Sequence, residues 1–246
     1  MTESISLTTR DDLELAGRWR PATTRSKGSA VVLAHGFTAS KDNPEVEAYS
    51  RGLADFGYDV LSYSSRGHKD SEGSCTLGDQ EQFDVEAAVE EAKRRTDKVV
   101  VFGASMGAIS VLRYAAHDHQ LAGAVALSSP ARWRTPRSAP ALLATWMTQT
   151  RLGRRFADRF LNIRIDPHWS NPAPPEALVA DIRVPLAVVH GQADPFIGSG
   201  EARRLAAAAV GPTRLELVPR MGHAFDKKGI PSIRRAIAWT LAVGIA

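Results

Sequence analysis

Cysteine is nearly absent from this chain, because Cys75 is the only one in 246 residues. A single cysteine excludes an intramolecular disulfide framework and any metal cluster built from cysteines. The lack of cysteine pairs is typical of proteins that work in a reducing compartment. We therefore expect a cytoplasmic location.

Long apolar runs and a secretory leader are lacking as well. The segment from Met1 to Arg10 carries Glu3 and no apolar core, so it does not match a signal peptide. The apolar stretches Leu121–Leu127 and Leu205–Val210 are far shorter than the roughly 18 residues that span a bilayer. The sequence thus predicts no stable membrane insertion.

Acidic residues are scarce in one part of the chain, although the net charge is only +4. Between Arg132 and Arg164 there are eight arginines and one acid, Asp158. This block could meet anionic substrates, a membrane surface or nucleic acid, and a solvated basic helix face is the commoner explanation. No basic motif interleaved with aromatic residues marks a nucleic-acid module, so no nucleic-acid partner is predicted. The sequence carries no signal for an oligomeric state.

The composition that is present belongs to an ordinary folded domain, with 43% hydrophobic and 24% charged residues. A chain of this length can bury a large core, and we predict a single domain over residues 1–246. Short apolar strands alternate with amphipathic helices along it. Ala30–Ala34, for example, is a continuous apolar run of the kind found in strands buried on both faces.

This alternation predicts an α/β fold with a mostly parallel sheet and helices on both faces. Ligands of such sheets bind beyond the carboxyl ends of the strands, so the loops that follow strands are the places to look for chemistry. The expected elements are an opening hairpin of Ser4–Thr9 and Leu13–Arg20, the strands Ala30–Ala34, Asp59–Tyr63, Lys98–Phe102, Ala122–Leu127, Leu186–Val189 and Arg214–Val218, and the helices Val46–Phe56, Gln80–Arg95, Ser105–Ala116, Glu201–Ala209 and Ile233–Leu241.

Residues 130–185 interrupt this alternation and contain eight of the 14 prolines. We expect two helices there, forming a small cap or lid over the sheet edge. The apolar faces around Trp146 and Phe156 could provide an acyl pocket or could be plain core packing. The two faces are Leu142, Leu143, Trp146 and Met147 on the first helix, and Leu152, Phe156 and Phe160 on the second.

The segment Gly103-Ala104-Ser105-Met106-Gly107 follows an apolar strand directly and opens a helix. This is the G-x-S-x-G pattern in the strand–turn–helix context that a nucleophilic serine requires. A sharp turn projects the hydroxyl above the sheet, and the flanking glycines leave room for the adjoining strand and helix. The pattern predicts Ser105 as the nucleophile, the alternative being a serine that merely caps the helix.

A serine nucleophile needs a base and a supporting acid, which follow it in that fold in the order acid, then histidine. His223 lies in the loop between the last strand and the last helix and is the predicted base, rather than an ordinary surface histidine. Asp194 follows the strand Leu186–Val189 and is the predicted acid. The alternatives are a turn-forming Asp194 before proline, with Asp226 as the main competitor for the acid.

An oxyanion hole needs two backbone N–H groups, one after the nucleophile and one from the loop after an earlier strand. Met106 fits the first position. Phe37 fits the second, because it follows the strand Ala30–Ala34, and Gly36 before it lets the loop bend close to a substrate. A plain glycine turn is the alternative explanation of that loop.

Together, His35-Gly36-Phe37, Arg66-Gly67-His68, Gly103-x-Ser105-x-Gly107, Gly191-x-x-Asp194-Pro195 and Gly222-His223 resemble the α/β-hydrolase superfamily. The likeness is to its small esterase, lysophospholipase-like and serine-aminopeptidase-like branch, from about Ala30 to Thr240. The resemblance implies an eight-stranded sheet, a Ser–Asp–His triad, and no metal or organic cofactor. One departure is Lys69, which stands where the family often has glycine, so we expect that loop to bend differently.

These residues predict a serine hydrolase, in particular a carboxylesterase that cleaves a small-molecule acyl ester through an acyl-enzyme. A thioesterase or an acyltransferase would use the same triad. An amidase or peptidase is a further alternative, but nothing in the sequence marks an amine-binding site. A non-catalytic binding protein on this fold is the alternative from another class; such proteins usually lose a triad member, and none is missing here.

Overall fold

An eight-stranded sheet forms the centre of the structure, a computed structural model in which residues 1–133 and 138–244 are described. Its strand order is β1-β2-β4-β3-β5-β6-β7-β8. β2 pairs antiparallel with β1 and β4, and the other neighbours pair in parallel. The strands are β1 (Glu3–Thr8), β2 (Glu14–Arg20), β3 (Ala30–Ala34), β4 (Asp59–Tyr63), β5 (Val99–Ala104), β6 (Gly123–Leu127), β7 (Leu186–Gly191) and β8 (Thr213–Val218).

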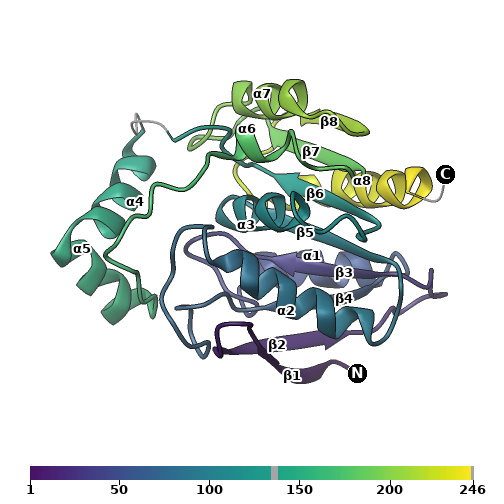
Figure 1. Ribbon diagram of the computed structural model, residues 1–246, viewed down its shortest axis with the longest axis horizontal. Coiled ribbons are helices and arrows are strands. Elements are labelled where there is room, and N and C mark those ends of the chain that lie inside the picture. Colours follow the sequence, from purple (N-terminus) through teal and green to yellow (C-terminus); the bar gives the residue numbers. More distant parts are fainter. Residues whose placement is uncertain (134–137, 245–246) are drawn as a thin grey trace.

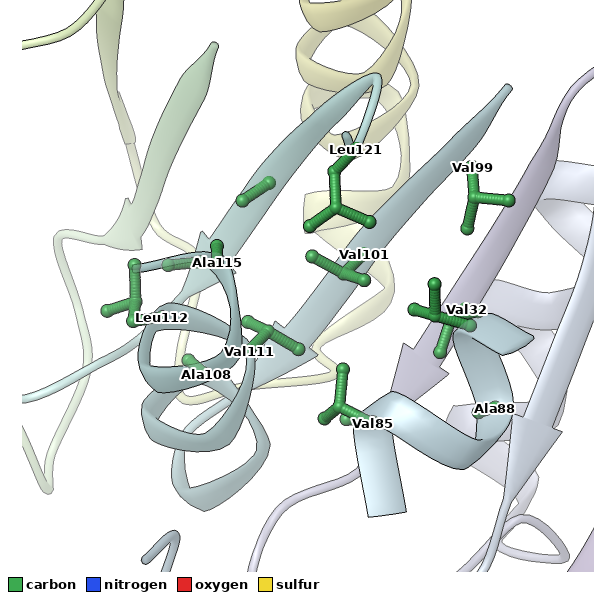
Figure 2. Close-up of a cluster of buried hydrophobic side chains, with 14 of the residues drawn as sticks. Val32, Val85, Ala88, Val99, Val101, Ala108, Val111, Leu112, Ala115 and Leu121 are labelled. Carbon is green, nitrogen blue, oxygen red and sulfur yellow. The ribbon is translucent and has the colours of Figure 1, made fainter. Parts of the chain in front are cut away.

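Helices cover both faces of this sheet, as the alternation predicts (Figure 1). Along β3, Val32 faces one hydrophobic core while Val31 and Leu33 face the other, because successive side chains of a strand point to opposite faces. α2, α3 and α7 pack on the first core, part of which Figure 2 shows, and α1 and α8 pack on the second. The helices are α1 (Pro44–Ala54), α2 (Glu81–Lys93), α3 (Met106–Ala115), α7 (Gly200–Ala208), the short η2 (Lys227–Gly229) and α8 (Ile230–Val243).

The predicted strands and helices are confirmed, with ends that differ by a few residues. The largest difference is at the start of α8, which begins at Ile230 rather than Ile233, and α1 likewise begins early, at Pro44 rather than Val46; both helix starts contain proline. Proline lacks a backbone N–H and suits the first helical turn, where that group has no partner anyway. α8 has 14 residues, and among the described helices none is long and apolar enough to cross a bilayer.

Both edge strands of the sheet carry charged or hydrogen-bonded polar side chains. On β1, Glu3 forms an ion pair with Arg95 (2.8 Å), and the hydroxyl of Ser6 donates to Glu14 of β2. On β8, the other edge, Glu216 forms an ion pair with Arg235 of α8. Neither edge therefore offers a bare apolar strand to solvent.

The segment between β6 and β7 contains α4 (Ala139–Gln149), α5 (Arg151–Phe156), the π-helical turn η1 (Ala157–Leu161) and α6 (Pro175–Leu178). We call α4, α5 and η1 the insertion helices; Figure 1 shows α4 and α5 standing to one side of the sheet. Gly153 allows the tight turn between them, since a Cβ there would lie 2.1 Å from the Trp146 carbonyl oxygen. The chain returns to the body of the protein where Arg164 N–H donates to Gly67 O (2.8 Å).

A buried ion pair ties the opening hairpin to the sheet and to α2. Arg66 follows β4, its side chain is 1% exposed, and its Nε donates to Oδ1 of the fully buried Asp84 (2.7 Å). Asp84 Oδ2 also accepts the Arg66 backbone N–H (2.8 Å). The other end of the guanidinium donates to Asp11 in the hairpin turn (2.8 and 3.0 Å). Arg66 thus links the loop after β4 to α2 and to the turn of the opening hairpin.

We expect Arg66→Met to lower the free energy of unfolding by about 3–5 kcal/mol, because it leaves the Asp84 carboxylate buried without its partner. Urea denaturation followed by circular dichroism measures this loss. The double variant Arg66→Met/Asp84→Leu should recover part of it, since no buried charge remains. The control Arg94→Met removes an exposed ion pair with Glu91 and should cost less than about 1 kcal/mol. A loss in Arg66→Met no larger than in the control would contradict the assignment.

Candidate active site

Ser105 occupies the turn between β5 and α3 in a strained backbone conformation. Its φ of 55° and ψ of −114° lie in a region that residues with a Cβ rarely adopt, which costs about 1–3 kcal/mol. The Ser105 N–H donates to Leu127 O at the end of β6 (2.9 Å), which anchors the turn. The side chain therefore sits at the N-terminus of α3, beyond the carboxyl end of β5.

The glycines on either side of this turn are required by close backbone contacts. A Cβ at Gly103 would lie 2.1 Å from the Gly107 carbonyl oxygen, and a Cβ at Gly107 would lie 2.4 Å from the Ala34 carbonyl oxygen. Real Cβ atoms do not approach so closely, so strand, turn and helix fit together only with glycine at both positions. This contact is the physical reason for the G-x-S-x-G spacing.

His223 and Asp194 meet from neighbouring loops, which follow β8 and β7. His223 Nδ1 lies 2.7 Å from Asp194 Oδ2, and the Asp194 side chain is 1% exposed. The other carboxylate oxygen, Oδ1, accepts the N–H groups of Phe196 (2.8 Å) and Ile197 (2.9 Å). Burial raises the pKa of Asp194, but the hydrogen bonds and charge of His223 and the two amides outweigh it, so the pKa lies below its usual value. An ionised Asp194 holds the proton of His223 on Nδ1 and leaves Nε2 free to accept one.

Asp226, the competing acid, has a different role in the structure. Its carboxylate accepts the N–H groups of Gly222 (2.8 Å) and Lys228 (3.0 Å), and no hydrogen bond joins it to His223 among the described residues. Asp226 therefore shapes the loop that carries His223. On the other side of this loop, Ser128 Oγ accepts the Ala224 N–H (3.1 Å), a contact that no sequence motif marks.

Ser105 and His223 line the same cavity, together with Asp194. Within the described part of the chain, no hydrogen bond joins Ser105 Oγ to the His223 ring. Hydrogen bonds between nucleophile and base are often long without substrate and shorten when it binds. The structure thus brings the three predicted side chains to one cavity and joins two of them, Asp194 and His223, by a hydrogen bond.

Phe37 and Met106, whose backbone N–H groups are the predicted oxyanion-hole donors, line the same cavity. Neither N–H donates to any acceptor among the residues described. The Phe37 loop passes close to the nucleophile, because a Cβ at Gly36 would lie 3.4 Å from the Ser105 Cβ. Two unpaired N–H groups beside a serine can stabilise the negative oxygen of a tetrahedral intermediate.

Two buried histidines support this loop, and sequence reasoning gave neither a role. His68 Nε2 lies 2.6 Å from the Phe37 carbonyl oxygen and its Nδ1 lies 3.0 Å from the Arg66 carbonyl oxygen, so the ring joins the Phe37 loop to the loop after β4. His35 Nε2 accepts the Ser65 N–H (2.9 Å), and its Nδ1 donates to Gly36 O (2.8 Å). Burial, with the nearby His68, lowers the pKa of His35 to about 3. A neutral His35 therefore holds its bonds down to acidic pH.

Lys69, the departure from the family pattern, adopts the left-handed conformation with a φ of 52°. Glycine reaches this conformation without strain, whereas a side chain costs about 1–2 kcal/mol there. Lys69 therefore takes a conformation that glycine would adopt more easily. The Lys69 N–H donates to Asn162 O (2.9 Å), which joins this loop to the end of η1.

The cavity has a volume of about 880 Å³ and a mostly apolar lining. α4 forms one wall with small or short side chains at helical spacing. Trp146 and Phe156 do not line it; they are exposed on the far side of the insertion helices. Both explanations of these two residues, as pocket walls or as core, are therefore wrong. The α4 residues on the cavity are Ala141, Ala144, Thr145, Thr148 and Gln149, and the apolar lining elsewhere includes Leu77, Ile109, Trp133, Phe196 and Ile197.

The arginine block divides into residues with different surroundings. Arg132 pairs with Glu176 (2.7 Å), Arg164 donates to Gly73 O (3.1 Å), and Arg154 donates to Thr148 O at the end of α4 (3.0 Å). The arginines at 134 and 137 lie outside the described residues. Arg132, Arg151, Arg155 and Arg159 are exposed, and the last three form no ion pair with an acid among the described residues.

In the described part of the chain, no group of three or more His, Cys, Asp or Glu residues could hold a metal ion. Cys75 is fully buried with its Sγ 3.5 Å from Met106 Sδ, and burial raises the pKa of its thiol well above the usual value. The thiol therefore packs beneath the nucleophile turn in its protonated form.

Comparison with known proteins agrees with this architecture. Residues 25–175 match the family described as serine aminopeptidase, S33. The chain is 27% identical over 203 residues to the uncharacterised protein YqkD of Bacillus subtilis, covering 80% of this chain and 66% of YqkD, slightly less than two thirds of that relative. The Pyrococcus furiosus esterase Pf2001 superimposes with a TM-score of 0.75 at 22% identity, covering 100% of this chain and 91% of the esterase. The α/β hydrolase GrgF from Penicillium gives 0.74 at 19%, covering 99% of both chains. At these identities the likeness establishes the fold.

Proposed function

The chain belongs to the serine aminopeptidase S33 family of hydrolases and has the α/β-hydrolase fold, and we propose that it cleaves carboxylic esters with Ser105, His223 and Asp194. One observation carries the proposal. One mostly apolar cavity is lined by the strained Ser105, by Asp194 and His223 with their hydrogen bond of 2.7 Å, and by Phe37 and Met106, whose N–H groups are unpaired among the described residues. The naming of Pf2001, a structural neighbour, as an esterase also supports an ester substrate.

The reaction begins when Ser105 Oγ attacks the ester carbonyl carbon and His223 Nε2 takes the hydroxyl proton. The carbonyl oxygen becomes an oxyanion that accepts hydrogen bonds from Phe37 N–H and Met106 N–H. Each such donor contributes about 2.7–4 kcal/mol to stabilising the transition state. The intermediate collapses as His223 gives the proton to the departing alcohol, which leaves an acyl group on Ser105.

Water completes the cycle by the same route. His223 Nε2 accepts a proton from water, whose oxygen attacks the acyl carbon, and the proton then returns to Ser105 Oγ as the carboxylic acid leaves. Asp194 keeps the imidazole in the required tautomer and stabilises its protonated form. The insertion, residues 130–185, acts as the lid of the acyl site, because the α4 side chains at 141, 144, 145 and 148 form a wall of the cavity.

Labelling with a fluorophosphonate, followed by mass spectrometry of the intact protein and its peptides, tests the nucleophile. We expect one adduct per chain, on Ser105. In parallel, p-nitrophenyl esters of increasing acyl length measure hydrolysis, and the length at which kcat/KM falls reports the depth of the cavity. Absence of both labelling and ester hydrolysis would refute the proposal.

Three other substrate series separate the ester from its rivals. Acyl-coenzyme A thioesters test a thioesterase, and an added alcohol acceptor tests acyl transfer. Aminoacyl p-nitroanilides test the peptidase activity that the family description suggests. A kcat/KM for a thioester or an anilide higher than that for the esters would contradict the ester assignment and leave the proposed triad unaffected.

A further inference from the structure

The outer surface of the insertion helices carries large apolar side chains that no other described element covers. Six of the eleven exposed large hydrophobic residues of the described chain lie on these helices. Leu152 and Phe160 are each 70% exposed, far more than a side chain that belongs to a core. We call this set the outer patch; its members are Leu142, Leu143, Trp146, Leu152, Phe156 and Phe160.

The outer patch is continuous across both helices. The rings of Trp146 on α4 and Phe156 on α5 have centroids 5.7 Å apart, and those of Phe156 and Phe160 are 5.0 Å apart. Leu152 lies one helical turn before Phe156. Figure 1 shows α4 and α5 at the side of the molecule, with no labelled element beyond them. An apolar surface of this kind marks a place where something binds.

The charge around the outer patch is positive and unpaired. Arg151, Arg155 and Arg159 are exposed on α5 and η1. Within the described residues, none of the three lies within 4.0 Å of an acidic group, whereas most arginines of the body form such ion pairs. The single acid of these helices is Asp158. The partner of the patch should therefore be apolar and anionic.

We propose that the outer patch is a docking surface for an anionic lipid bilayer. Its leucines and aromatic rings enter the boundary between headgroups and acyl chains, and the three arginines contact lipid phosphates. Helices that lie in a membrane surface typically carry aromatic rings at this boundary and basic residues beside them. The binding is peripheral and needs no spanning helix.

A second copy of the chain fits the outer patch less well. Two-fold contacts bring the same surface of both copies together. The three unpaired arginines of one copy would then meet those of the other, with one Asp158 on each side to offset them. An anionic bilayer supplies the opposite charge to all three arginines at once.

The two sides of α4 connect this surface to the cavity. Ala141, Thr145 and Thr148 line the cavity, while Leu142, Leu143 and Trp146 lie on the opposite side of the same helix. Docking would hold the lid at the bilayer with its inner face toward Ser105. Membrane binding itself requires no catalysis, so it can be tested apart from the proposed esterase activity.

Cosedimentation with vesicles tests the proposal. The full chain is mixed with vesicles of equal parts phosphatidylcholine and phosphatidylglycerol, or of phosphatidylcholine alone. We expect binding to the first, much weaker binding to the second, and a decrease as salt is raised. Arg151→Glu/Arg155→Glu/Arg159→Glu should weaken binding by about a hundredfold, since each basic residue at an anionic surface contributes about fivefold. Leu152→Ser/Phe160→Ser should weaken it by about tenfold or more.

Matched controls place the same changes elsewhere on the surface. Arg25→Glu/Arg183→Glu/Arg203→Glu gives the same change of net charge, and Val210→Ser removes an apolar side chain that is 71% exposed. Both should bind within about twofold of the original chain. All variants should hydrolyse a short p-nitrophenyl ester as the original does, because none of these residues lines the cavity. That readout also shows that each variant is folded.

Three results would overturn the proposal. The first is no binding to anionic vesicles, and the second is equal weakening by the controls. The third is a dimer in light scattering that Leu152→Ser/Phe160→Ser dissociates, with no vesicle binding, which would make the outer patch a contact between two copies. Failure of ester hydrolysis with vesicle binding intact would instead refute the proposed function alone.

Discussion

Ser105→Ala is expected to lower kcat for p-nitrophenyl ester hydrolysis by about a millionfold, because it removes the hydroxyl that forms the proposed acyl-enzyme. The strained turn suits alanine no worse than serine, so the fold should remain intact. What activity persists comes from substrate binding and the Phe37 and Met106 N–H groups. Steady-state kinetics on highly purified protein, with fluorophosphonate labelling alongside, measure the change.

Ser110→Ala is the matched control for this variant. Ser110 is a buried serine on the same helix, and its hydroxyl donates only to backbone carbonyls of α3 (3.2 Å). We expect it to keep kcat within a few-fold, at a stability cost of about 1 kcal/mol for the lost hydrogen bonds. A Ser105→Ala protein that still hydrolyses esters at more than about a hundredth of the original rate would show that another residue is the nucleophile.

Asp194→Asn should lower kcat by about 10⁴-fold, and the surrounding hydrogen bonds give the reason. The N–H groups of Phe196 and Ile197 both donate to Oδ1, so the oxygen of an asparagine must take that place. The amide nitrogen then faces His223 Nδ1 and donates to it. His223 is left with its proton on Nε2, where it cannot accept the proton of Ser105.

Asp226→Asn separates the two candidate acids. Both oxygens of Asp226 accept backbone N–H groups, so asparagine loses one hydrogen bond in the loop and disturbs His223 only indirectly. We expect a loss of kcat/KM below about tenfold and a stability cost of about 1 kcal/mol. Comparing kcat/KM of Asp194→Asn and Asp226→Asn on the same ester shows which aspartate supports His223. Equal losses in the two variants would contradict the assignment of Asp194 as the supporting acid.

Sequence patterns predicted the middle of the sheet well because the strands β3, β5, β6 and β7 are buried on both faces. Continuous apolar runs such as Ala30–Ala34 are hard to reconcile with any other element, and β3 has the bounds that its run predicts. Ser105 could be predicted as well, because the close backbone contacts around its turn admit only glycine at positions 103 and 107 and so leave a recognisable sequence pattern. Asp194 and His223 were found by their position after strands, and the structure joins them by a hydrogen bond.

The insertion helices were predicted only in part. Apolar residues at helical spacing show that a helix has an apolar side, but they do not show what that side faces. For Leu152 and Phe160 it faces solvent, an outcome that the pattern cannot distinguish from burial. The supporting contacts of His68 and Ser128 were missed for another reason. Each is a bond to a backbone atom of a residue distant in sequence, and such bonds leave no motif.

The charged edges of the sheet have a consequence for behaviour at high concentration. An open sheet ends in two strands whose outer N–H and C=O groups can pair with a strand of another molecule, which is how many sheet proteins aggregate. Here a strand approaching β1 meets Glu3 and its ion pair with Arg95, and one approaching β8 meets Glu216 with Arg235. Edge-to-edge growth would have to desolvate these charges. The sheet therefore resists polymerisation at its margins, and any self-association should begin elsewhere on the molecule.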